Sequence, residues 1–130
     1  MRVRYAETDQ MAYVYYGNYA AYFEVGRVEC LRELGFSYKK LEEEGVLLPV
    51  MDFNINYKRP ALYDDLLTIK TTIPEMPGAR IKFNYETYNE KGELLNEAQT
   101  TLVFVNRSTG RPIKAPEGLM KAMREKFEGQ

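Results

Sequence analysis

The chain has 130 residues, of which 45% are hydrophobic, so it is the size of one ordinary domain and can bury a core. Its net charge of −1 gives no electrostatic reason to expect a nucleic acid or an anionic membrane as a partner, and its one cysteine and lack of a long apolar run favour a cytoplasmic protein. Histidine is absent, which excludes Ser-His-Asp and Cys-His catalysis, histidine-ligated metal sites and a histidine-dependent dehydratase.

The first quarter of the chain predicts a strand, a loop and a long helix. Charged and apolar residues alternate over Arg2–Tyr5, which predicts a short strand. Residues 7–18 are irregular and place one carboxylate, Asp9, among several tyrosines. Apolar residues then recur at spacings of three and four, which predicts a helix with Asn18 as its N-cap and an end at Gly35. Its apolar face comprises Tyr19, Tyr22, Phe23, Gly26, Cys30, Leu31 and Leu34.

The rest of the chain predicts a short helix, four strands and a final helix. Ser37–Glu44 begins with a good N-cap residue and reads as a helix, and Pro116–Phe127 carries apolar residues at helical spacing. A period of two marks four strands, which are Met51–Tyr57, Leu67–Ile73, Arg80–Tyr85 and Leu94–Val105. Hairpin-length connections favour antiparallel pairing, so we predict an α+β fold in which an antiparallel β-sheet wraps around the long central helix as one domain, residues 1–130. Exposed sheet edges also favour pairing with a second copy.

Asp9 lies a few residues before the predicted start of the long helix, an arrangement that suits chemistry on a carbonyl group. A helix N-terminus offers unpaired amides and a positive dipole end, and without histidine a general base must be a carboxylate, a lysine or a tyrosine. Each residue also has a structural interpretation. Asp9 could cap a turn, Asn18 could cap the helix, and Glu24 and Arg27 could form an ion pair three residues apart on the helix surface.

The segment from Asp9 to Tyr19, Asp-Gln-Met-Ala-Tyr-Val-Tyr-Tyr-Gly-Asn-Tyr, resembles the signature of the hotdog-fold acyl-CoA thioesterases of the 4-hydroxybenzoyl-CoA thioesterase and YbgC-like group. The likeness continues through three later segments, so that it covers nearly the whole chain: Tyr22–Arg27, Tyr57–Asp65 and Gly110–Pro112. YbgC-like members usually carry histidine at the position of Tyr16. The hydroxybenzoyl-CoA branch carries tyrosine there and then proline, whose place Gly17 takes.

This resemblance implies a hotdog fold and the hydrolysis of an acyl-CoA thioester to a free acid and CoA. Asp9 would act as general base or as nucleophile, and the backbone amide of Tyr16, with that of Gly17, would polarise the carbonyl. Further substrate contacts are expected from three residues that follow Asp9 and from four basic residues near the CoA phosphates: Tyr13, Tyr15, Asn18, Lys58, Arg59, Arg80 and Lys82.

The resemblance also implies a groove between two protomers of a homodimer or homotetramer, in which Asp9 of one protomer meets the Tyr57–Pro60 segment of the other. No metal and no cofactor are expected, because coenzyme A is part of the substrate. Two other functions fit the same residues. One is a thioesterase that acts on acyl carrier protein, which a preference for the protein-borne thioester would reveal. The other is a non-catalytic protein that binds acyl-CoA without turnover.

Overall fold

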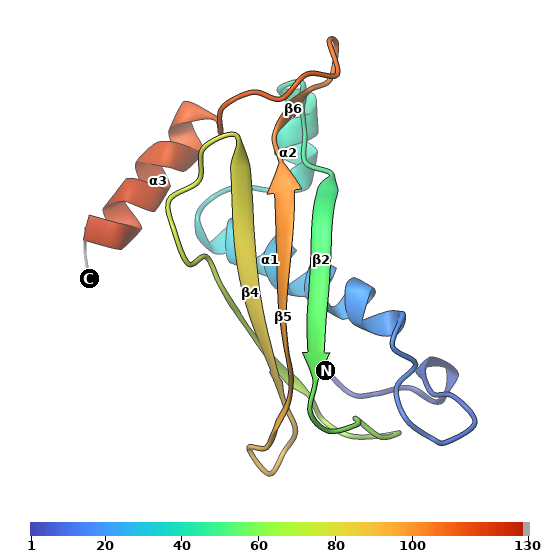
Figure 1. Ribbon diagram of the computed structural model, residues 1–130. Helices are drawn as coiled ribbons and strands as arrows, with labels where there is room; N and C mark the ends of the chain where they lie inside the picture. The colour runs from blue at the N-terminus through green and yellow to red at the C-terminus, as the bar shows by residue number, and fades with distance from the viewer. Residues whose placement is uncertain (129–130) are drawn as a thin grey trace.

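The computed structural model describes residues 1–128 and shows an antiparallel sheet with one long helix, α1, lying across its inner face (Figure 1). Residues 129 and 130, the end of the predicted domain 1–130, lie outside the described residues. The elements in chain order are a 3₁₀ helix Tyr5–Glu7, α1 Asn18–Glu33, α2 Tyr38–Glu43, β1 Val46–Leu47, β2 Val50–Tyr57, β3 Thr68–Thr72, β4 Arg80–Tyr88, β5 Leu94–Val103, β6 Val105–Asn106 and α3 Glu117–Glu128. The α+β hotdog architecture predicted from the sequence is therefore confirmed.

The main sheet has the strand order β2-β5-β4-β3, and every neighbouring pair is antiparallel. A turn over residues 89–93 joins β4 to β5, as the sequence predicts. The connection over residues 58–67 is not a hairpin, because it carries the chain from β2 at one edge of the sheet to β3 at the other. A second, two-stranded sheet pairs β1 with β6, and both strands are too short to produce a visible period in the sequence.

The inner face of the sheet and the apolar face of α1 form the core. Along β4 every second side chain is buried, from Ile81 to Thr87, which confirms the period of two. The ring of Phe23 in α1 stacks on that of Tyr85 with centroids 4.5 Å apart. Strand β2 differs from this pattern: no side chain along it is buried in the single chain, and Phe53 keeps 37% of its surface exposed. The apolar face of this edge strand is therefore only partly covered by its own chain.

Helix α1 begins and ends with recognisable local structure. Gly17, not Asn18, is the N-cap, and the Asn18 side chain instead donates from Nδ2 to the Glu7 carbonyl oxygen at 2.8 Å. At the other end Gly35 has φ +87, and the amide of Phe36 donates to the carbonyl of Leu31, which is a Schellman motif. The predicted end at Gly35 is confirmed, and the predicted N-cap is wrong by one residue.

Two further sequence predictions are corrected by the structure. Arg2–Tyr5 is not a strand, because Arg2 forms one isolated bridge with Leu66 and Tyr5 opens the 3₁₀ helix. Arg27 does not pair with Glu24 on the helix surface. It is buried and donates from Nε to the Tyr38 hydroxyl of α2 at 2.9 Å. Both errors arise because short local patterns carry no information about what packs against them.

Candidate active site

Asp9 holds together the tight loop that precedes α1. Its Oδ1 accepts hydrogen bonds from the amides of Met11 (2.8 Å) and Tyr13 (3.3 Å), and its own amide donates to the Tyr13 carbonyl at 2.8 Å. Ala12 inside this loop has φ +65, a left-handed conformation that the surrounding hydrogen bonds maintain. Within residues 1–128 no hydrogen bond reaches Oδ2, so one oxygen of this exposed carboxylate fixes its orientation while the other is free of protein hydrogen bonds. The structural and the chemical interpretation of Asp9 are thus compatible.

The start of α1 leaves two backbone amides unpaired. Asn18 and Tyr19 donate their amides to the carbonyls of Tyr15 and Tyr16, but in the described part of the chain the amides of Tyr16 and Gly17 have no acceptor. The segment is anchored from outside, because the Glu7 carbonyl accepts both the Tyr15 amide and the Asn18 side chain at 2.8 Å. The two free amides are therefore held in place by the fold and are available to a ligand.

A groove of about 420 Å³ brings these groups together, within the usual size range of small-molecule sites. Its lining residues come from the loop, from the start of α1 and from the segment after β2: Asp9, Tyr13, Val14, Tyr16, Tyr19, Tyr57, Lys58, Arg59 and Pro60. Five of the residues that the sequence singled out lie here. The Tyr57–Pro60 segment, expected from a second protomer, lies beside Asp9 of the same chain, because a bridge from Tyr13 to Leu62 draws the two segments together.

The other predicted site residues do not line this groove. Tyr15 packs on Tyr16 with ring centroids 4.7 Å apart and covers Gly17, where a Cβ would lie 2.8 Å from the Tyr15 ring. The side-chain amide of Asn18 already donates a hydrogen bond to the Glu7 carbonyl. Arg80 and Lys82 lie at the opposite end of the sheet from the groove. On β5, the partner of Arg80 is Val103 and the partner of Tyr57 is Asn96, and these two partners are seven residues, or about 24 Å, apart along the strand.

Lysine and arginine side chains at the groove differ in their partners. Arg59 forms an ion pair with Glu93 at 3.1 Å, and the amides of both Lys58 and Arg59 donate to the Leu95 carbonyl. Lys82, at the far end of the sheet, forms an ion pair with Glu75 at 3.3 Å. Of the four predicted basic contacts, only Lys58 and Arg59 can therefore reach a ligand in this groove of the same chain.

Polar groups that the sequence did not single out lie behind the groove. Asn96 and Thr87 are cross-strand neighbours on the inner face of the sheet, and both are completely buried. Among the described residues, neither side-chain amide atom of Asn96 has a hydrogen-bond partner, and the Thr87 hydroxyl also lacks one. An asparagine in an alternating strand looks like any outward-facing polar residue, so only the register with Tyr57 reveals its place.

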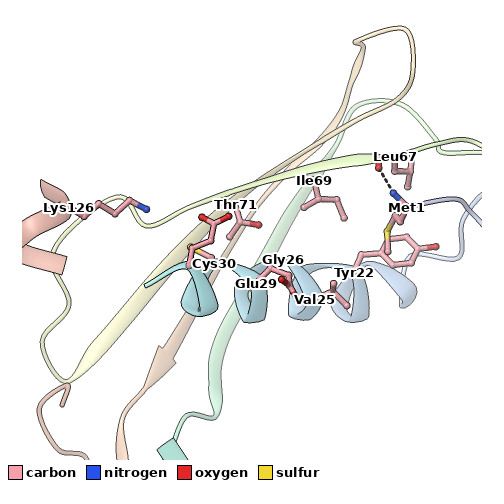
Figure 2. A pocket seen from close by; sticks show the side chains of 11 residues that line it. Met1, Tyr22, Val25, Gly26, Glu29, Cys30, Leu67, Ile69, Thr71 and Lys126 are labelled. Atoms are coloured by element: carbon pink, nitrogen blue, oxygen red, sulfur yellow. Dashed lines mark hydrogen bonds between the residues drawn. The ribbon is translucent and has the colours of Figure 1, made fainter. Parts of the chain in front are cut away.

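A second, smaller cavity of about 310 Å³ lies between α1 and β3 (Figure 2). Tyr22 and Gly26 face Ile69 and Thr71 across it, with Lys126 at one end. The hydroxyls of Tyr22 and Thr71 are buried there without a hydrogen-bond partner in the described part of the chain. None of the predicted site residues lines this cavity.

Two negative findings apply to residues 1–128. No helix is both long and apolar enough to cross a membrane, and no three His, Cys, Asp or Glu side chains gather into a possible metal site.

Comparison with known proteins gives consistent matches over most of the chain. A family model described as the Thioesterase-like superfamily matches residues 3–123. A putative acyl-CoA thioesterase, YneP of Bacillus subtilis, is 41% identical over 114 residues, which cover 88% of this chain and 83% of the relative. The acyl-CoA thioester hydrolase YbgC of Escherichia coli is 34% identical over 125 residues, with coverages of 96% and 93%. The crystal structure of a DHNA-CoA thioesterase from Staphylococcus aureus has a TM-score of 0.89 and 37% identity, covering 100% of this chain and 92% of that one.

Proposed function

The chain belongs to the thioesterase-like superfamily, and from this premise we propose that it is an acyl-CoA thioesterase, which hydrolyses an acyl-CoA to the free acid and CoA. One observation supports assigning the chemistry to the groove at the start of α1. The carboxylate of Asp9, with one oxygen free, lies in the same groove as Tyr16, whose backbone amide has no acceptor within residues 1–128.

In this proposal Asp9 activates or replaces the attacking water. Its free oxygen either accepts a proton from a water molecule as that water attacks the thioester carbonyl, or attacks the carbonyl carbon itself to give a mixed anhydride that water then hydrolyses. In both routes the carbon–sulfur bond breaks and CoA leaves as a thiolate. The Met11 and Tyr13 amides keep the carboxylate oriented toward the groove during the reaction.

The negative charge that develops on the carbonyl oxygen needs hydrogen-bond donors that are already in position. The Tyr16 amide, with the Gly17 amide beside it, fills this role, and the N-terminal end of the 16-residue α1 dipole adds to the stabilisation. One such donor contributes roughly 3–4 kcal/mol to the transition state. Lys58 and Arg59 lie where they can meet the phosphates of CoA, and Tyr13 would contact the acyl group.

We also propose that a second copy of the chain completes the groove. Strand β2 is an open sheet edge with Met51, Phe53 and Tyr57 exposed, and its last residue leads directly into the groove segment Lys58–Pro60. A protomer paired along this edge would cover these side chains and form a wall of the site. Arg80 and Lys82, which are remote from the groove of their own chain, would reach CoA only from such a neighbour.

Free-thiol release from acyl-CoAs between acetyl and palmitoyl in length, plus benzoyl- and hydroxybenzoyl-CoA, tests the proposed reaction. Asp9→Asn should reduce kcat by roughly 10²–10⁴ because it removes the base or nucleophile. The asparagine Oδ1 can still accept from the Met11 and Tyr13 amides, so the loop should keep its shape. Light scattering of the same sample should give at least twice the 15.2 kDa of one chain.

Asp65→Asn is the matched control. Asp65 is also a turn aspartate whose carboxylate accepts a backbone amide, that of Leu62 at 2.8 Å, but it does not line the groove. Near-normal turnover by Asp9→Asn, or an equal loss in both variants, would contradict the mechanism. A folded wild-type protein that is inactive on every CoA substrate would favour acyl carrier protein substrates or a binding role.

A further inference from the structure

The two free amides at the start of α1 are held on both sides by a single atom, the carbonyl oxygen of Glu7. This oxygen accepts the backbone amide of Tyr15 and the Nδ2 amide of Asn18, each at 2.8 Å. Tyr16 and Gly17, whose own amides have no acceptor within residues 1–128, lie between these two points of attachment. A shift of the Glu7 carbonyl would therefore move both free amides.

The side chain of Glu7 fixes where that carbonyl lies. Its Oε1 accepts the backbone amide of Arg4 at 2.8 Å, and its Oε2 lies 3.4 Å from the Arg4 guanidinium. In return the Glu7 amide donates to the Arg4 carbonyl at 2.9 Å. These reciprocal contacts close the 3₁₀ helix Tyr5–Glu7, in the manner of a capping box. The turn that carries the Glu7 carbonyl is therefore held by the carboxylate of the same residue.

The glutamate needs an explanation beyond its backbone, because any residue supplies a carbonyl oxygen. Only 13% of the Glu7 side chain is exposed, whereas its partner Arg4 is 80% exposed. Burial of a charged group is unfavourable unless the group is well paired, and an ion pair with so exposed an arginine contributes little. The local contacts alone therefore give a weak reason for a carboxylate here, and a role in holding the neighbouring segment gives a stronger one.

The carboxylate of Glu7 also faces α1. Tyr22 lies four residues after Asn18 on the same helix face, so Glu7 meets two successive turns, with its carbonyl at Asn18 and its carboxylate beside the Tyr22 hydroxyl. The Tyr22 ring lies at the end of the α1–β3 cavity, beside Met1 (Figure 2). Burial raises the pKa of Tyr22 above its ordinary value, and the Glu7 carboxylate acts in the same direction. The hydroxyl therefore stays protonated and presents a donor beside the carboxylate.

Building on the proposed thioesterase function, we propose that Glu7 is a positioning residue for the reaction. Its carboxylate, held by Arg4 on one side and facing Tyr22 on the other, fixes its own carbonyl oxygen. That oxygen in turn orients the amides of Tyr16 and Gly17 toward the thioester carbonyl. Glu7 does not line the groove, so it acts only through these amides. Because they stabilise charge that develops in the transition state, loss of Glu7 should affect kcat and leave KM nearly unchanged.

Glu7→Ala tests the proposal, because it removes the carboxylate and keeps the backbone carbonyl. With the best acyl-CoA substrate, kcat should fall by about 10–100-fold and KM should change by less than about threefold, since a small misplacement of a catalytic group is costly. Glu7→Gln keeps an oxygen that can accept the Arg4 amide and should recover kcat to within about threefold of the wild type. The assays run at a temperature at which circular dichroism shows every variant folded, so a loss of stability alone would leave kcat unchanged.

Glu90→Ala is the matched control. Glu90 Oε1 accepts the backbone amide of Leu66 at 3.3 Å and lies 3.7 Å from the Arg2 guanidinium, so the residue makes the same two kinds of contact as Glu7. It lies in the turn between β4 and β5 and does not line the groove. Both kcat and KM of this variant should equal those of the wild type.

Backbone amide resonances in ¹⁵N–¹H NMR spectra report on the same segment without turnover. The resonances of Tyr16 and Gly17 should shift or broaden in Glu7→Ala and in Asn18→Ala, because each change loosens one attachment of the segment, and they should stay in place in Glu90→Ala. Since Glu7 and Asn18 act through one oxygen atom, the double variant should lose little more kcat than the more impaired single variant.

The assignment is overturned if Glu7→Ala keeps its kcat, if Glu90→Ala loses as much, or if the losses of Glu7→Ala and Asn18→Ala multiply in the double variant. Failure here is distinguishable from failure of the proposed function. Asp9-dependent turnover with a fully active Glu7→Ala variant would remove only the positioning role. A wild type that is inactive on every acyl-CoA would remove the proposed function, and unchanged Tyr16 and Gly17 resonances in Glu7→Ala would then remove the positioning role as well.

Discussion

Gly26 is a position where α1 packs tightly against β3, and Gly26→Ala tests how tightly the helix is held against the sheet. A Cβ at residue 26 would lie 2.5 Å from the Thr71 Oγ1, which no real pair of such atoms tolerates. The next neighbours, Ile69 Cγ2 and Thr71 Cβ, would be 3.6 and 3.8 Å away, at ordinary contact distances. The whole conflict is therefore with one oxygen atom.

Two opposing effects set the magnitude. Alanine is favoured over glycine inside a helix by about 1 kcal/mol, and Gly26 lies in the middle of α1. Overpacking at a tight contact costs about 1–3 kcal/mol, because either Thr71 or the helix must move. Gly26→Ala should therefore lower the free energy of unfolding by up to about 2 kcal/mol, although an exposed helix position would gain from the same change.

A double-mutant cycle with Thr71→Ala isolates the contact. Thr71→Ala removes Oγ1, which makes no hydrogen bond within residues 1–128, so in that background Gly26→Ala should stabilise the protein by about 1 kcal/mol. Thr71→Val is the control, because it keeps an atom where the oxygen was and should give no relief. Urea unfolding at equilibrium provides the free energies, and about 1 kcal/mol corresponds to roughly 3–5 °C in Tm.

A coupling energy near zero between residues 26 and 71 would refute this reasoning. So would stabilisation by Gly26→Ala in the wild-type background, since it would mean that α1 can move off β3 without cost. Relief by Thr71→Val as large as that by Thr71→Ala would show that the oxygen atom is not the obstacle.

Two further predictions concern the anchor of the loop that precedes α1. Asn18→Ala should lower the free energy of unfolding by about 1 kcal/mol, because it removes the hydrogen bond from Nδ2 to the Glu7 carbonyl. Asn18→Asp should lower it by as much, because aspartate is a good helix cap but cannot donate this bond. If urea unfolding shows that Asn18→Asp keeps the wild-type stability, Asn18 acts as a helix cap instead. Burial opposes ionisation of Glu7, but hydrogen bonds from the Arg4 amide and guanidinium outweigh it and hold the pKa of Glu7 below its ordinary value. The resulting stabilisation is complete above the unfolded-state pKa of Glu7 and is lost as the pH falls through its folded-state pKa. Between pH 7 and pH 3, Tm should therefore drop less in Glu7→Gln than in the wild type. Equal drops in the two proteins would contradict the role of Glu7.

The sequence predicts helices and strands well where one side of the helix or strand is buried and the other is exposed to solvent. The alternation over Ile81, Phe83 and Tyr85 gives β4, and the spacing of Tyr22, Phe23 and Leu31 gives the face of α1, because both faces contact the same core. Predictions fail where a contact with a residue far away in the sequence determines the local structure. Asn18 bonds to a residue eleven positions earlier, and Arg2 finds a single partner at Leu66, which no local period contains.

The candidate site shows the same division. A local motif suffices to single out Asp9 and Tyr16, which lie close in the chain and line one groove. The inner end of the groove depends on strand register, because Asn96 lies behind Tyr57 only through the pairing of β2 with β5. Residues brought together by a sheet are separated by about forty positions in the sequence, and an unaligned chain offers no signal for such a pair.

The strand order also has a consequence for the protein as it emerges from the ribosome. Among the described strands β2 pairs only with β5, and the synthesis of β5 ends at Val103, 46 residues after Tyr57. At 5–20 residues per second, β2 waits about 2–9 s for its partner, with its backbone hydrogen-bonding groups unpaired. The Tyr57–Pro60 wall of the groove is therefore among the last parts of the chain to reach its place. During those seconds the nascent chain presents an unpaired strand edge, the kind of surface through which neighbouring nascent chains associate.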